Sequence, residues 1–187
     1  QQGIKRVFLV GCGAPNREMG AIKYWMDRDM KTLETYLYFP AEFINQAPAK
    51  LGADSLVVVG SKGGAGATTV VIEVASRLAG TVAILDLGEP IGSVADRFGV
   101  STQLELGELA RTASGVPSRR ISDAATALPI EPVLFGGMPG TVDGAALRRL
   151  IEIIAGEFDH VVVDGGRGLS IQAETAIRVA DQVLVVV

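Results

Sequence analysis

The stretch LVVVGSKGGAGATTVVIEVASRL, residues 56–78, decides the fold of this chain. It begins with a short valine-rich run, continues through a glycine-rich loop and ends in a segment of helical period. A strand, loop and helix in this order let backbone N–H groups and the helix dipole surround a phosphate. Thr68 and Thr69 open the helix, where a hydroxyl can cap it or bind a magnesium ion.

The loop departs from the general phosphate-loop pattern G-x-x-x-x-G-K-[ST] at two positions. Ser61 occupies the first glycine position, and Ala67 occupies the lysine position. A loop lysine places positive charge against the β- and γ-phosphates, so its absence predicts weaker binding and slow hydrolysis. The residues that we expect to hold the nucleotide are Gly63, Gly64, Ala65, Gly66, Ala67, Thr68 and Thr69.

Valine-rich runs alternate with segments of helical period through the rest of the chain. The runs are short and continuously apolar, which is typical of strands buried on both faces of a parallel sheet. This alternation predicts an α/β fold, doubly wound, with a mostly parallel sheet and helices on both faces. The predicted strands cover residues 7–10, 56–59, 82–85, 132–135, 161–163 and 183–187, and the predicted helices cover residues 68–79, 144–155 and 170–180.

The composition excludes several classes of protein. The formal net charge of −4 argues against binding to nucleic acid driven by charge, so no nucleic-acid partner is indicated. The single cysteine, Cys12, permits no internal disulfide, which favours a reducing compartment. No apolar run approaches the ~18 to 20 residues of a transmembrane segment. We therefore expect a cytoplasmic chain.

The N-terminal segment, residues 1–52, differs from the rest because it holds all three tyrosines and the only tryptophan. Residues 23–39 are predicted to form a helix whose aromatic side chains pack on a neighbour. Residues 39–52 contain proline and alanine in a pattern typical of a linker. We therefore place a domain boundary near residue 52, between a strand–helix segment and a nucleotide-binding domain over residues 53–187.

The loop KGGAGATT, residues 62–69, resembles the deviant Walker A motif KGGxGKTT of the MinD/ParA family of ATPases. The resemblance extends over roughly residues 55–187. It implies that Lys62 is the signature lysine, which reaches across a dimer to the partner's nucleotide. It also implies that Thr68 binds magnesium and that Thr69 lies near the α-phosphate.

Two further stretches resemble motifs of the same family. VAILDLGEP, residues 82–90, is similar to the switch motif D-x-D, in which Asp86 matches the first aspartate. Gly88 replaces the second aspartate, which helps to position the attacking water. FDHVVVDGGRGLS, residues 158–170, is similar to the Walker B region, and the match implies that Asp164 holds magnesium through water. A role of Asp86 as a simple helix cap stays open.

Ala67 and the stretch RGLS, residues 167–170, resemble the CpaE/TadZ branch of the family, which acts in Flp (Tad) pilus assembly. This branch implies a homodimeric switch that binds ATP or ADP with Mg²⁺ and helps to place a pilus or secretion machine at a cell pole, on the inner face of the membrane. It also implies a domain truncated after residue 187. Residues 1–52 would then be a remnant of a receiver-like domain, or a strand and helix that complete the sheet.

Two other functions stay open. The first is an active partitioning ATPase of the ParA/MinD type whose loop lysine was mutated to alanine at position 67. A natural gene with lysine at that position would decide for it. The second is an interaction scaffold that keeps the fold and binds no nucleotide. A melting temperature that does not respond to ATP would favour the scaffold.

Overall fold

The computed structural model describes residues 6–11, 35–40, 55–88, 93–102, 104, 106–115, 121–136 and 142–187. The strands in these ranges are β1 (Arg6–Gly11), β2 (Thr35–Pro40), β3 (Ser55–Gly60), β4 (Val82–Asp86), β5 (Thr126–Ala127), β6 (Val133–Gly136), β7 (His160–Arg167) and β8 (Gln182–Val186). The helices are α3 (Ala67–Ala75), α4 (Ser93–Phe98), α5 (Leu106–Gly115), α6 (Gly144–Glu157) and α7 (Ile171–Val179), together with the 3₁₀ turn η2 (Ile121–Ala124).

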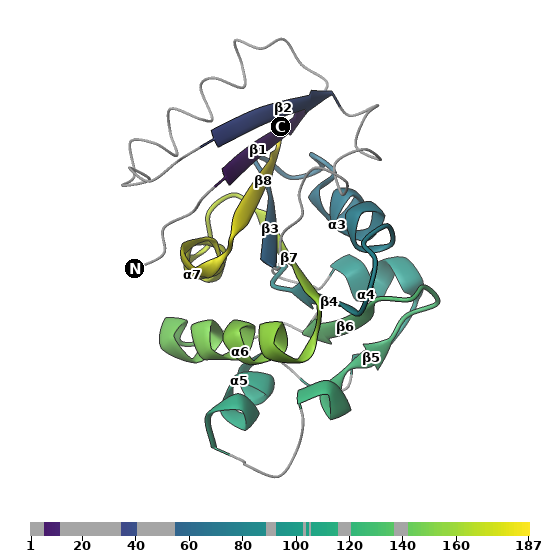
Figure 1. Cartoon of the computed structure of the whole chain (residues 1–187), viewed down its shortest axis with the longest axis vertical. Helices are drawn as coiled ribbons and strands as arrows, with labels where there is room; N and C mark the ends of the chain where they lie inside the picture. Colours follow the sequence, from purple (N-terminus) through teal and green to yellow (C-terminus); the bar gives the residue numbers. More distant parts are fainter. Residues whose placement is uncertain are drawn as a thin grey trace.

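The strands form one sheet in the order β2-β1-β8-β3-β7-β4-β6-β5 (Figure 1). Neighbouring strands are parallel, except that β5 runs antiparallel to β6. Strand β3 lies between β7 and β8, so the loop that follows it opens at the carboxyl edge of the sheet. The mostly parallel sheet confirms the predicted α/β fold class.

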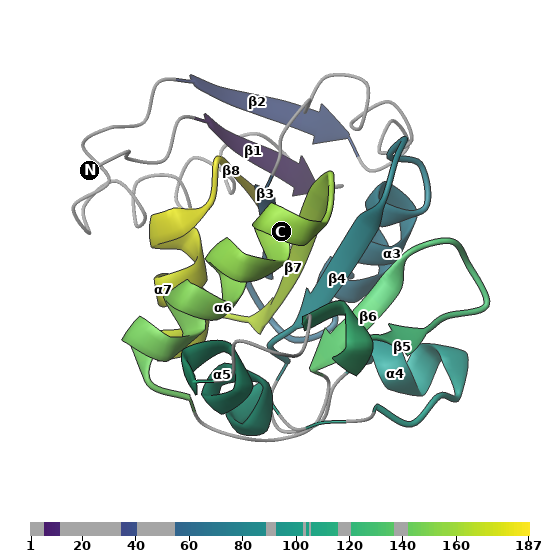
Figure 2. The same cartoon turned by 60° about the horizontal axis from the view of Figure 1, so that its bottom comes forward.

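Apolar side chains of the central strands divide between the two faces of the sheet. On β3, Val57 and Val59 belong to one buried cluster, whereas Leu56 and Val58 belong to the other. The first cluster includes side chains of α5, α6 and α7, and the second includes those of α3 and α4. Figure 2 shows these two groups of helices on opposite sides of the sheet. This burial on both faces explains why the strands read as continuous apolar runs.

The three predicted helices and the six predicted strands are all present, with ends shifted by a few residues. The helix predicted over residues 23–39 is wrong at its C-terminal end, because residues 35–40 form β2, parallel to β1. Threonine, tyrosine and phenylalanine favour strands, and the ladder to β1 satisfies the backbone groups. Residues 23–34 and 41–52 lie outside the described residues.

Strand β1 hydrogen-bonds to β8 and therefore extends the same sheet as the nucleotide-binding domain. Such pairing agrees with the second possibility for the N-terminal segment, a strand that completes the sheet. The domain boundary near residue 52 stays a prediction. In the described ranges, each helix is too short or too polar to span a lipid bilayer.

We expect Leu150→Ala to lower the free energy of unfolding by about 2–5 kcal/mol, because it opens a cavity in the core. Leu150 lies on α6 and is fully buried in the first cluster. Urea denaturation measures the change. Ile171→Ala is the control, since Ile171 is 79% exposed and its truncation should change stability by no more than about 0.5 kcal/mol. Equal losses in the two variants would contradict this packing.

Candidate functional site

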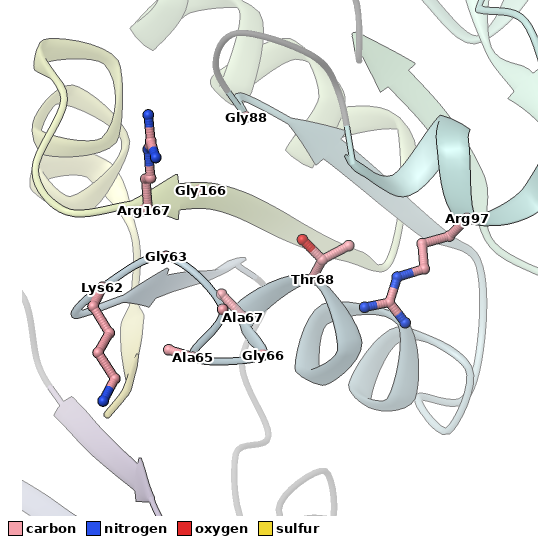
Figure 3. A pocket seen from close by; sticks show the side chains of 11 residues that line it. Lys62, Gly63, Ala65, Gly66, Ala67, Thr68, Gly88, Arg97, Gly166 and Arg167 are labelled. Carbon is pink, nitrogen blue, oxygen red and sulfur yellow. The ribbon is translucent and has the colours of Figure 1, made fainter.

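A pocket of about 320 Å³ lies at the carboxyl edge of the sheet, around the loop between β3 and α3 (Figure 3). Its wall is formed by the glycine-rich loop and the start of α3, by the turn after β4, by α4 and by the end of β7. The lining residues are Lys62, Gly63, Gly64, Ala65, Gly66, Ala67, Thr68, Gly88, Arg97, Gly166 and Arg167. Six of the seven residues predicted to hold the nucleotide therefore lie together, and Thr69 is next to them in the chain.

The backbone of the loop depends on glycine at two positions. Gly64 and Gly66 have φ angles of 77° and 97°, in the left-handed region that other residues rarely adopt. An added Cβ at either position would meet no atom within 4 Å, so the constraint is conformational. Alternation of left-handed and right-handed residues is a geometry in which successive N–H groups form a concave anion site.

Thr68 joins the loop to the neighbouring strand. Its Oγ1 donates a hydrogen bond of 2.7 Å to Oδ2 of Asp164, which stands on β7 and is fully buried. The other oxygen of Asp164, Oδ1, accepts a hydrogen bond of 2.9 Å from the N–H of Gly166. The structure thus brings together the two residues predicted to hold magnesium. A hydroxyl and a carboxylate are oxygen ligands of the kind that Mg²⁺ prefers.

Asp86 stands beside Asp164, because the two residues are paired in the register of β4 and β7. Its Oδ2 accepts a hydrogen bond from the N–H of Val94 in the first turn of α4, and its Oδ1 accepts one from the N–H of Gly88. Asp86 therefore makes the helix-cap contact that the sequence left open. Its role as the first aspartate of a switch motif stays a prediction.

The environment of Asp86 favours its protonated form. Burial, together with the nearby charge of Asp164, raises the pKa of this carboxyl to about 7, against the lowering effect of the hydrogen bonds from Val94 and Gly88. Two buried carboxyls side by side repel each other when both are ionised. A proton on Asp86 removes that repulsion, and so would a divalent cation.

Three cationic side chains surround the cradle. Lys62 points away from Thr68, as Figure 3 shows, and its contact with a partner stays a prediction. Arg97 donates a hydrogen bond of 3.0 Å from Nη2 to Oγ1 of Thr69. Sequence reasoning missed Arg97, because it belongs to no motif, and it used Arg167 only as a mark of one branch of the family.

Comparison with solved structures identifies the fold. The chain is similar to a ParA family ATPase from Chlorobium tepidum TLS, with 18% identity over 70% of this chain and 59% of that chain and a TM-score of 0.62. It is similar to the septum site-determining protein MinD of Pyrococcus horikoshii OT3, solved with Mg-ADP, with 21% identity over 71% of this chain and 56% of that one and a TM-score of 0.52. The chain is also similar to the VpsO kinase domain, with 13% identity and a TM-score of 0.61. That match covers 92% of this chain and 83% of the VpsO domain.

These likenesses show the α/β fold of the MinD/ParA P-loop ATPases, as the motifs predicted. Assignment to the CpaE/TadZ branch rests on the motifs alone. No family model matches the chain. Among curated proteins it is 33% identical, over 105 residues, to the fructosamine deglycase FrlB of Bacillus subtilis (strain 168). That match takes 56% of this chain and only 32% of FrlB, so the chain spans about a third of this relative.

We expect the stability of the protein to depend on pH through Asp86. Folded Asp86 keeps its proton up to about pH 7, whereas the unfolded side chain releases it near pH ~4. Its contribution is therefore complete below pH ~4 and is lost as the pH rises towards 7. The unfolding free energy of the wild type, minus that of Asp86→Asn, should fall between pH 5 and 7 by up to about 1.4 kcal/mol per pH unit.

Urea denaturation across this pH range measures the difference, and any constant cost of the Asn amide cancels from the slope. Asp159→Asn is the control, and its difference should stay flat between pH 5 and 7. Hydrogen bonds from the N–H and hydroxyl of Thr81 lower the pKa of Asp159, so this carboxyl is ionised throughout that range and its stabilisation is lost only below pH ~4. A flat difference for Asp86→Asn would show that this carboxyl titrates normally.

Proposed function

We propose that the protein is a nucleotide-binding switch that holds ATP or ADP with Mg²⁺ and hydrolyses ATP slowly or not at all. The main support is the pocket over the glycine-rich loop. Thr68 lines this pocket, and its hydroxyl donates a hydrogen bond to the buried Asp164 carboxylate. Backbone amides at this loop and the start of α3 suit a phosphate, and the oxygen pair suits Mg²⁺. The fold shared with MinD, whose solved structure holds Mg-ADP, supports the proposal.

Two features of the pocket argue for slow hydrolysis. Ala67 brings no charge to the β- and γ-phosphates, where phosphoryl transfer needs stabilisation. Gly88 has no side chain to orient a water, and its N–H is bonded to Asp86. The site can therefore bind a nucleotide with fewer of the groups that promote its cleavage. The switch would then depend on whether a nucleotide is bound, and not on rapid hydrolysis.

The wider role rests on motif resemblance. We propose a homodimer in which Lys62 of each copy contacts the nucleotide of the other, with the dimer forming only when nucleotide is bound. We further propose that the protein acts in the cytoplasm, at a polar site on the inner face of the membrane, with proteins of a Flp/Tad pilus or related secretion machine as partners. RGLS at residues 167–170 is the sequence feature behind this last step.

A second candidate comes from the curated relative. The 33% identity with a fructosamine deglycase over 105 residues is the observation that supports a sugar-amine ligand as the alternative to a nucleotide. The two candidates differ in what they require of the pocket. A nucleotide requires the Thr68–Asp164 pair and Mg²⁺, whereas the fructosamine candidate makes no prediction for them. Ligand titration with and without Mg²⁺ separates the two.

We expect Mg-ATP to raise the melting temperature of the wild-type protein, because a ligand that binds only the folded state stabilises it. Thr68→Ala should remove most of the effect of Mg²⁺, since it deletes one predicted ligand. Thr175→Ala is the matched control, because the Thr175 hydroxyl bonds only within its own helix, to the carbonyl of Ile171. Thermal shift with ATP, ADP and fructosamine, each with Mg²⁺ or EDTA, measures these effects.

A shift with fructosamine and none with ATP or ADP would favour the second candidate. No shift with any of them would favour the nucleotide-free scaffold. If ATP binds, a turnover assay on the same protein tests the switch, and brisk hydrolysis would contradict it.

We expect Lys62→Ala to abolish dimer formation with ATP while the monomer still binds nucleotide, because the side chain points away from its own cradle. Light scattering after size exclusion measures the mass with and without Mg-ATP. Arg148→Ala is the control, since Arg148 is exposed on α6 and paired with Glu152. A wild type that stays monomeric with ATP bound, or a Lys62→Ala variant that dimerises equally well, would contradict the role of Lys62.

A further inference from the structure

The phosphate pocket keeps positive charge although its loop has lost the usual lysine. Of the eleven lining residues, three are cationic, namely Lys62, Arg97 and Arg167, and none is acidic. Lys62 points away from the cradle, which leaves the two arginines near it. Ala67, in the lysine position, is nearly buried and can carry no charge to a ligand. Within one copy of the protein, a cationic side chain that contacts the phosphates of a bound ligand must therefore come from outside the loop.

Arg167 ends strand β7, three residues after Asp164, and its guanidinium lies over the loop. A Cβ built on Gly63 would stand 3.8 Å from Cδ and 3.9 Å from Nη1 of Arg167. These are ordinary van der Waals distances, so the arginine rests against the glycine without strain. Figure 3 shows the side chain extending from the end of β7, next to the loop at Gly63.

Arg97 approaches from the other side, on helix α4. Its Nη2 is fixed by the hydrogen bond to Thr69 Oγ1, at the start of α3. The carboxylate of Asp86 holds this helix, because it accepts a hydrogen bond from the N–H of Val94, three residues before Arg97. Figure 3 places Arg97 and Arg167 on opposite sides of Thr68. A phosphate in the cradle would therefore have a guanidinium on each flank.

The charges of these arginines are not used elsewhere in the described part of the chain. Three other arginines there pair with a glutamate on their own helix, as Arg77–Glu73, Arg148–Glu152 and Arg178–Glu174. Arg97 and Arg167 form no ion pair with any described residue. A guanidinium offers several N–H donors in a plane and binds phosphate oxygens in pairs. Two such groups beside an anion cradle favour a ligand with more than one phosphate.

We propose that Arg97 and Arg167 replace the missing loop lysine and make the site selective for nucleoside di- and triphosphates over monophosphates. The inference rests on the proposed nucleotide site and assigns the charge that the loop lacks. Arg167 reaches the phosphates across Gly63, and Arg97 reaches them across the start of α3. The end of β7 and helix α4 would thus supply the positive charge that a loop lysine supplies in the usual phosphate loop.

Calorimetric titration with Mg-ATP, Mg-ADP and AMP tests the proposal on the full chain. We expect Arg97→Ala and Arg167→Ala each to weaken Mg-ATP binding by about tenfold and AMP binding much less, because a charge-assisted hydrogen bond is lost at the outer phosphates. Arg148→Ala is the matched control and should bind all three as the wild type does. Both arginines are exposed, so the variants should keep the melting temperature of the free protein.

Two further variants separate charge from architecture. Arg97→Gln keeps a side-chain donor for Thr69 and removes the charge; a purely structural role of Arg97 predicts that Arg97→Gln binds Mg-ATP as the wild type does, whereas the proposal predicts the loss expected for Arg97→Ala. Ala67→Lys in the Arg167→Ala background should restore Mg-ATP affinity, because it returns a cation to the cradle. Wild-type binding of Mg-ATP that neither arginine variant weakens would overturn the inference and leave the nucleotide site standing. Absence of nucleotide binding by the wild type would overturn both.

Discussion

The hydrogen bond between Thr68 Oγ1 and Asp164 Oδ2 is the contact on which the candidate site depends. It joins the start of α3 to β7, and so fixes the glycine-rich loop against the neighbouring strand. Asp164 is fully buried, and leaving a buried acceptor without a partner costs about 1–3 kcal/mol or more. The hydroxyl of Thr68 and the N–H of Gly166 meet that need. The hydroxyl oxygen of Thr68 and the carboxylate of Asp164 are also oxygen ligands of the kind that Mg²⁺ prefers.

The second carboxyl, Asp86, turns this contact into a site sensitive to charge. Burial next to Asp164 holds the pKa of Asp86 near 7, so it keeps a proton where an exposed aspartate would be ionised. A divalent cation relieves the same repulsion and favours the ionised form. Binding of Mg²⁺ between the two carboxyls would therefore release a proton. A proton and a metal ion would then compete for the same place, because the strand register pairs the two carboxyls.

Sequence alone predicts the parts of this arrangement that are local. The strand, loop and helix of residues 56–78 could be read because apolar runs and glycine spacing depend on neighbours in the chain. Strand β2 was missed because its aromatic residues also fit a helical period, and only pairing with β1 decides between them. Arg97 was missed for a similar reason. It meets Thr69 across 28 residues, through a short helix with no motif of its own.

If Arg97 and Arg167 supply the phosphate charge, as we propose, the change of position has a structural consequence. The backbone of the loop itself would position a lysine at position 67. Arg97 is instead positioned by α4, and the first turn of that helix donates a hydrogen bond from the N–H of Val94 to the Asp86 carboxylate. Asp86, which lies beside the proposed metal ligand Asp164, thus also holds the helix that carries Arg97. If Asp86 turned one oxygen towards a bound cation, the anchor of α4 would change with it. Under the proposed function, metal, proton and phosphate binding would therefore be coupled through this one side chain, a coupling that a lysine in the loop would not provide.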